Sequence, residues 1–208
     1  MARSLASRPM TDTVPIRNAA SLILWRSSGA GVQVLMGQRG HAAVFMPSKY
    51  VFPGGAVDAG DHATGHLHPD CGARLALHCT ENAPTPEALA GCGLRELAEE
   101  TGLILAPAAP MRFVFRAITP ALSPRRFDAR FFLADAAHIA GDFDDFTAAT
   151  DELSHLHWIG LTGARQLDLP FITEVVLAEV AAHLANLPQP GVPFFDNSGP
   201  VPTFRRLT

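Results

Sequence analysis

Apolar positions change their spacing along the chain, and each spacing predicts one kind of element. Residues 19–25 and 32–38 are apolar-rich runs separated by a glycine-bearing turn, which predicts a β-hairpin. A loop and a short strand are expected over 46–52, ahead of a Pro-Gly-Gly turn. Further β-like runs occupy residues 112–119, 128–134 and 156–159.

Two segments have the spacing of helices. A helix is predicted over 86–101, with Thr85 as its N-cap, Pro86 at its first position and Gly102 just past its end. A C-terminal helix is predicted over 171–187, where valine and leucine side chains recur along one face. Because strands and helices are interspersed, we expect one domain of mixed α/β layers spanning the whole chain, 1–208.

Three segments lack a sustained period. Residues 1–15 are expected to form a flexible N-terminal tail, because they have no apolar centre of the kind a secretory signal needs; a short transit peptide is the alternative. Residues 56–84 are expected to be an insertion, with a short helix over 73–79. The proline- and glycine-rich residues 188–208 are expected to form a surface tail.

Charge and cysteine content narrow the class of protein. The net charge is −4 and the basic residues are scattered, so we expect no binding of bulk nucleic acid. No apolar run approaches the length of a membrane span, and none is expected. Three irregularly placed cysteines are typical of reduced thiols in a cytoplasm. A homodimer is not readable from the sequence and stays open.

The string Arg-Glu-Leu-Ala-Glu-Glu-Thr-Gly-Leu at 95–103 carries the clearest chemistry. On a helix, Glu96, Glu99 and Glu100 crowd one edge, and like charges at that spacing cost about 0.2–0.5 kcal/mol per pair. A divalent cation bound by carboxylate oxygens offsets this repulsion and can activate water. The alternative is a solvated charged face, which the ordered string disfavours.

Together with the glycine turn at Gly54 and Gly55, this string resembles the Nudix box of hydrolases that cleave diphosphates linked to another moiety. The resemblance implies an α+β fold, an α/β/α sandwich with a mixed sheet. It implies Mg²⁺ or Mn²⁺ as cofactor and a small-molecule diphosphate as substrate. The residues it implies are metal ligands Glu96, Glu99 and Glu100, catalytic Glu99 and Glu100, an orienting Arg95, and substrate-binding Gly54 and Gly55.

The fourth acidic position of the box is ambiguous. In the common pattern five residues separate the glycine from this acid, and Asp61 keeps that distance from Gly55. Glu87 instead keeps the seven-residue distance to Arg95, but thirty-one residues separate it from Gly55. Asp61 and Glu87 therefore compete for the position, and Asp58 is a weaker rival. A long insertion splitting the box explains the conflict.

Such an insertion is similar to one found in the coenzyme A diphosphatase-like subgroup, so coenzyme A or an acyl-coenzyme A is the expected substrate. Nucleotide sugars, dinucleotides and a non-catalytic nucleotide-sensing role are the alternatives. Arginines give bidentate contacts to phosphate, and the candidates are Arg125, Arg126 and Arg130, with Arg39 behind them. Glu152 is a candidate for one more ligand or water-positioning carboxylate, against the alternative of a plain loop acid.

The insertion also raises the question of zinc. His66, His68, Cys71, His78 and Cys79 lie close together in sequence, and zinc sites use such ligands. Their spacing matches neither paired Cys-x-x-Cys nor a zinc finger. Exposed histidines are therefore the expectation, with structural zinc as the alternative.

Overall fold

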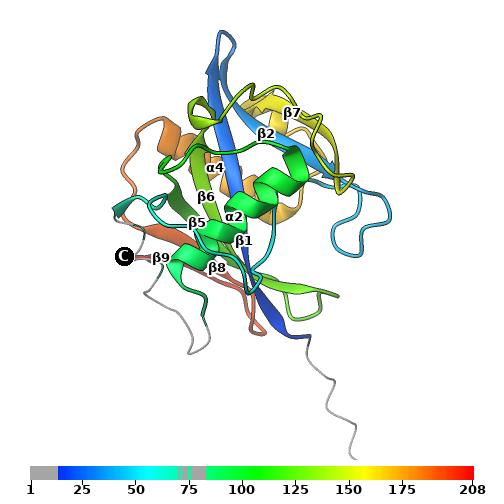
Figure 1. Cartoon of the computed structure of the whole chain (residues 1–208). Coiled ribbons are helices and arrows are strands. Elements are labelled where there is room, and N and C mark those ends of the chain that lie inside the picture. Colours follow the sequence, from blue (N-terminus) through cyan, green and yellow to red (C-terminus); the bar gives the residue numbers. More distant parts are fainter. Residues whose placement is uncertain (1–13, 70, 72–74, 76–82) are drawn as a thin grey trace, which may run out of the picture.

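The computed structural model describes residues 14–69, 71, 75 and 83–208. A mixed sheet forms its centre, with strand order β3-β2-β1-β6-β5-β8-β9, while β4 pairs with β1 and β7 with β2 (Figure 1). The strands are β1 Ile16–Ser28, β2 Gly31–Arg39, β3 Tyr50–Val51, β4 Gly54–Ala56, β5 Arg112–Ile118, β6 Arg126–Asp135, β7 Leu153–Gly160, β8 Val192–Asp196 and β9 Thr203–Leu207.

Helices cover both faces of this sheet. The helix α2 (Pro86–Thr101) packs against one face, and α4 (Phe171–Leu184) packs against the other, as Figure 1 shows. A short helix α3 (Leu161–Ala164) follows β7, and a 3₁₀ turn, η1, spans Ala136–His138. The predicted α+β class and the layered arrangement are confirmed. Within the described residues, no helix is long and apolar enough to cross a membrane.

The strand pattern explains how the two layers are held. β1 and β2 form the predicted antiparallel hairpin, and β1 also runs parallel to β6 along most of its length. Because side chains alternate along a strand, Leu22 and Leu24 face α2, whereas Ile23 packs in the cluster beneath α4. The sheet is thus buried on both faces, and its central strands are almost wholly apolar at their middle.

The predicted ends of α2 are confirmed. The Thr85 hydroxyl accepts a hydrogen bond from the Ala88 amide at 3.2 Å, and Gly102 has a left-handed backbone (φ 76°) that ends the helix. Gly91, inside the helix, is explained by a close approach. A Cβ there would lie 2.3 Å from the amide nitrogen of His62, so the chain that leaves β4 crosses the helix at this residue.

The prediction of a surface tail over 188–208 is wrong for two stretches. β8 runs parallel to β5, and β9 pairs antiparallel with β8, so the sheet continues to its last strand with these residues. Val192, Phe194 and Leu207 are buried in the core on the α2 side. The prolines and glycines lie mainly before and between the two strands. Their number led to the prediction of a surface tail, although two short apolar runs lie among them.

The segment after β4 is tied down where it is described. Leu67 forms a parallel bridge with Met111, whose amide donates to the His66 carbonyl at 2.6 Å. The short helix predicted over 73–79 falls outside the described residues, except for Leu75, which is buried. The helix predicted over 171–187 ends three residues earlier, at Leu184.

Candidate active site

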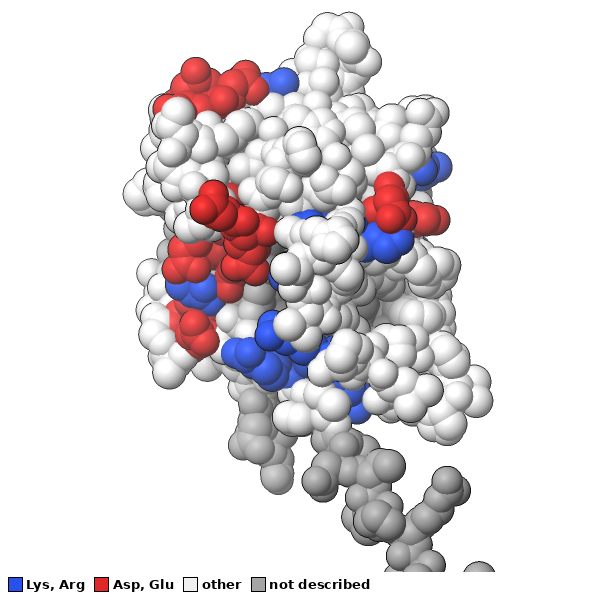
Figure 2. Space-filling view, turned by 90° about the vertical axis from the view of Figure 1, so that its right-hand side faces the viewer, with Lys and Arg blue, Asp and Glu red and all other residues white. Residues whose placement is uncertain are grey.

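A cavity of about 480 Å³ opens beside the glycine turn and the helix α2. Acidic and basic side chains lie close together on the face of the molecule shown in Figure 2. The charged residues that line the cavity are Asp58, Glu96, Glu152, Arg17, Arg39 and Arg125. Aromatic residues complete its walls, among them Phe45, Phe127, Phe171 and Phe195.

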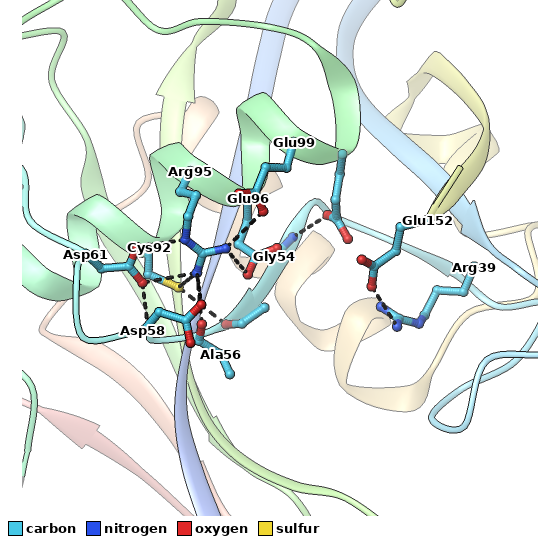
Figure 3. A network of polar contacts seen from close by, with 12 residues as sticks. Arg39, Gly54, Ala56, Asp58, Asp61, Cys92, Arg95, Glu96, Glu99 and Glu152 are labelled. Atoms are coloured by element: carbon cyan, nitrogen blue, oxygen red, sulfur yellow. Dashed lines mark hydrogen bonds and ion pairs between the residues drawn. The ribbon is translucent and has the colours of Figure 1, made fainter. Parts of the chain in front are cut away.

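Arg95 is the centre of a carboxylate cluster at one end of the cavity (Figure 3). Its Nε donates to Asp61 Oδ1 at 2.8 Å, and its Nη1 donates to Glu96 Oε1 at 2.8 Å and Glu99 Oε2 at 3.0 Å. Its Nη2 donates to the carbonyl of Ala56 at 3.0 Å. The hydrogen bonds that Arg95 donates to Asp61 are the main cause that raises the pKa of Arg95 above its ordinary value. The guanidinium thus positions the carboxylates around it.

The structure brings Asp61, and not Glu87, to this cluster. The Asp61 side chain is 4% exposed and bonds Arg95 through both oxygens. Although burial pushes its pKa upward, hydrogen bonds from Arg95 and the Asp58 amide hold the pKa of Asp61 below its ordinary value. Glu87 lies at the start of α2 and makes no hydrogen bond or ion pair with Arg95. Asp58 lies farther from Arg95, at 3.8 Å.

Glu100 is the most deeply buried of the helix glutamates, with 1% of its surface exposed. Its Oε2 accepts a hydrogen bond from the Gly54 amide at 2.8 Å, while its Oε1 is buried without a partner. Burial, together with the charges of Glu152 and Glu96, raises the pKa of Glu100 to about 8. Burial also raises the pKa of Glu96, despite its contact with Arg95.

Gly55 lies so close to the helix that no side chain would fit. A Cβ at this position would lie 2.1 Å from Glu96 Oε1. The glycine turn therefore lets the backbone of β4 approach the carboxylates directly, which is the physical reason for glycine here. Gly54 contributes its amide to Glu100, so both glycines act on the carboxylate cluster.

Glu152 and Arg39 face the helix from the opposite side of the cavity. Arg39 is the last residue of β2, and Glu152 immediately precedes β7, which pairs with it. Their side chains form an ion pair at 3.3 Å, and Arg39 Nε is buried without a partner. The negative charge of Glu152 acts on both Glu96 and Glu100 by raising their pKa. This loop acid therefore lies within electrostatic reach of the helix carboxylates.

The three arginines predicted for phosphate do not lie together. Arg125 lines the cavity, but Arg126 and Arg130 alternate to the other face of β6, where both are buried. Arg130 bonds Asn18 and forms an ion pair with Asp128 at 3.1 Å, and Arg126 donates to the carbonyls of Thr119 and Ser198. The sequence did not single out Arg17, which lies beside Arg125.

The described histidines and cysteines do not gather into a zinc site. His66 Nδ1 lies 3.1 Å from the carbonyl of Ala109, and Cys71 Sγ accepts from the Phe113 amide at 3.1 Å. Cys71 and Cys92 are free thiols. Across residues 14–69, 71, 75 and 83–208, no three His, Cys, Asp or Glu side chains are grouped to hold a metal ion as they stand. His78 and Cys79 lie outside the described residues.

Known proteins resemble this chain both in sequence and in fold. No family model matches it. The acyl-coenzyme A diphosphatase NUDT19 of Gallus gallus is 35% identical over a segment that covers 35% of this chain and only 25% of that protein. The crystal structure of a Nudix hydrolase from Alicyclobacillus acidocaldarius has a TM-score of 0.61 and 25% identity, covering 83% of this chain and 96% of that one.

A third likeness concerns the fold alone. The Nudix domain of Shewanella oneidensis NrtR, in a complex with ADP ribose, has a TM-score of 0.54 at 15% identity, and covers 86% of this chain and 94% of that one. The helix, the glycine turn and the mixed sheet that hold the carboxylate cluster therefore belong to a fold that this chain shares with solved Nudix proteins.

Proposed function

We propose that this chain is a metal-dependent hydrolase that cleaves the diphosphate linkage of coenzyme A or an acyl-coenzyme A. One observation carries the proposal: a single cavity joins a carboxylate cluster to arginines and aromatic walls. Carboxylates of this kind hold hard cations, arginines bind phosphate, and apolar walls accept the remainder of a substrate.

The residues at the helix fit a divalent cation such as Mg²⁺ or Mn²⁺. The buried, unpartnered Glu100 Oε1 is an oxygen ligand in need of a positive partner. Glu96 and Glu99, which now share Arg95 Nη1, are the other ligands we propose, with Glu152 opposite them. When bound, such a cation polarises the phosphoryl group and lowers the pKa of bound water.

The chain's own residues supply the positioning. Arg95 holds Asp61 and the first two glutamates in place, and Gly54 fixes the Glu100 carboxylate through its amide. Burial raises the pKa of Glu100 to about 8 in the cation-free protein, so binding of a cation by this carboxylate would release its proton. Arg39 and Arg125 line the cavity as groups for phosphate oxygens, Arg39 beside Glu152 and Arg125 toward the other end.

The choice of coenzyme A rests on two supports. The matched relative is named an acyl-coenzyme A diphosphatase. The cavity also carries aromatic side chains suited to an adenine ring or an apolar chain, with Phe45 and Phe127 in edge contact at 5.3 Å between ring centroids. The fold itself carries no such information about the substrate.

The test is hydrolysis of a panel of diphosphates with magnesium, by wild type and by Glu99→Gln. We expect coenzyme A to be cleaved faster than ADP-ribose or nucleoside triphosphates, and the variant to be slower by at least about a hundredfold. Glu87→Gln is the matched control, because Glu87 lies on the same helix outside the cluster. Equal activity of wild type and Glu99→Gln would disprove the catalytic role, and faster cleavage of ADP-ribose would disprove the choice of substrate.

A further inference from the structure

Two arginines lie side by side at the end of the cavity away from the glycine turn. In the parallel pairing of β1 with β6, Arg17 lies opposite Phe127, and Arg125 comes two residues before Phe127. Arg125 lies in the bend just before β6, so Arg17 and Arg125 come from neighbouring stretches of backbone. Both line the cavity. Basic side chains also gather below the acidic ones on the face in Figure 2.

These two arginines differ from the other arginines of the cavity region in having no ion-pair partner among the residues that the structure describes. Arg39 is paired with Glu152, and Arg95 is held by carboxylates of the cluster. Neither Arg17 nor Arg125 forms an ion pair or side-chain hydrogen bond within the part of the chain that the structure describes. Two neighbouring like charges repel each other, and an anion between them would relieve that repulsion.

The sheet register gives the distance between this pair and the carboxylate cluster. Ser21 of β1 lies opposite Gly54, next to the cluster, and Arg17 is four residues away along the same strand. At about 3.3 Å per residue, the Glu100 side of the cluster is roughly 13 Å from Arg17. The Arg95 side is nearer, at roughly 7 Å, because Ala56, whose carbonyl accepts from Arg95, lies opposite Ala19. Between Arg17 and the cluster, Ala19 and Ala129 pair across the strands and both line the cavity, so the floor there is made of small side chains.

We propose that Arg17 and Arg125 form a subsite for a phosphomonoester that the substrate carries in addition to its diphosphate. The inference rests on the proposed function, since it takes the diphosphate to bind at the carboxylate cluster. A group the size of a nucleoside lies over the alanine floor and spans the two ends. The substrate class is therefore a nucleotide with a diphosphate on one side of its sugar and a further phosphate on the other.

The experiment compares substrates that differ by this phosphate alone. Coenzyme A is paired with dephospho-coenzyme A, and NADPH with NADH, for wild type, Arg17→Ala, Arg125→Ala and the double variant. We expect wild type to prefer the phosphorylated member by at least about tenfold in kcat/KM. Each single variant should lose most of that preference, mainly through KM. Arg165→Ala, an exposed arginine outside the cavity, is the matched control and should keep it.

A binding measurement keeps the subsite testable if none of these compounds is cleaved, an outcome that would overturn the proposed function alone. By calorimetry, adenosine 3′,5′-bisphosphate should bind wild type at least about tenfold more tightly than AMP, and the double variant should bind both alike. Equal binding of the two ligands to wild type overturns the subsite. So does an equal loss of affinity for both in the double variant, because the arginines would then contact the shared phosphate.

Discussion

The two ends of the cavity handle their charges in opposite ways. At one end, Arg95 is surrounded by Asp61, Glu96 and Glu99, each within 3.0 Å of a guanidinium nitrogen. At the other end, Arg17 and Arg125 face the cavity without a carboxylate partner among the described residues. The Arg95 guanidinium is neutralised by protein carboxylates and fixes their positions. The guanidinium groups of Arg17 and Arg125 are available to bind an anionic ligand. Arginines in one cavity thus serve two different purposes.

The largest effect on activity is expected from replacing Arg95. Arg95→Ala leaves Asp61 and Glu96 close together, both nearly buried and without their counter-charge. Breaking such a pair costs about 3 kcal/mol, and the carboxylates should move apart. We expect hydrolysis to fall by at least about a hundredfold and the free energy of unfolding, measured with urea, to fall by about that amount.

Arg125→Ala is the comparison at the other end. It removes a cation that bonds no other side chain in the described part of the chain, so the free energy of unfolding should change by less than about 0.5 kcal/mol. If both variants destabilised the protein equally, the distinction between an organising and an open arginine would be lost.

A smaller effect is expected from the acid that holds Arg95. Asp61→Asn keeps the shape of the side chain but removes the charge that bonds Arg95 through two atoms. We expect hydrolysis to fall about tenfold, because the guanidinium would no longer be fixed relative to Glu96 and Glu99. Glu87→Gln should stay within about twofold of wild type. The reverse ranking of these two variants would assign the fourth acidic position to Glu87.

The helix α2 could be predicted from the sequence more fully than the carboxylate cluster that surrounds it. The ends of α2 follow from local signals, a threonine cap and a left-handed glycine, so they could be predicted residue by residue. The spacing of the helix glutamates likewise fixes which face they share. The choice between Asp61 and Glu87 could not be made from the local sequence. It depends on how the segment around His62, which precedes α2 in the chain, packs across the helix at Gly91.

The direction in which the arginine side chains of β6 point could not be predicted from the sequence either. A strand over 128–134 is readable from the sequence, but which of its faces lines a cavity depends on what packs on either side. Arg126 and Arg130 therefore looked equivalent to Arg125 and are buried on the other face of β6. β8 and β9 were missed for a related reason. Their short apolar runs are recognisable as strands only beside β5, which supplies their pairing.

The last prediction concerns the dependence of stability on pH and needs no measurement of activity. The pKa of Glu100 is about 8 in the folded protein and returns toward its ordinary value of 4.5 on unfolding. Between those values the folded state holds a proton that the unfolded state has released. The stabilisation is complete below about pH 4.5 and is lost as the pH rises toward 8, by at most about 1.4 kcal/mol per pH unit.

Urea unfolding between pH 5 and 8, in the presence of a chelator, should therefore show the free energy of unfolding falling more steeply for wild type than for Glu100→Gln. Glutamine can still accept the hydrogen bond from the Gly54 amide but cannot ionise, so subtraction isolates the titration of this carboxyl. Arg125→Ala should run parallel to wild type, since this substitution leaves the Glu100 carboxyl and its bond to Gly54 in place. Parallel curves for Glu100→Gln and wild type would show that Glu100 is charged in the fold, with its desolvation offset by a partner at the carboxylate end.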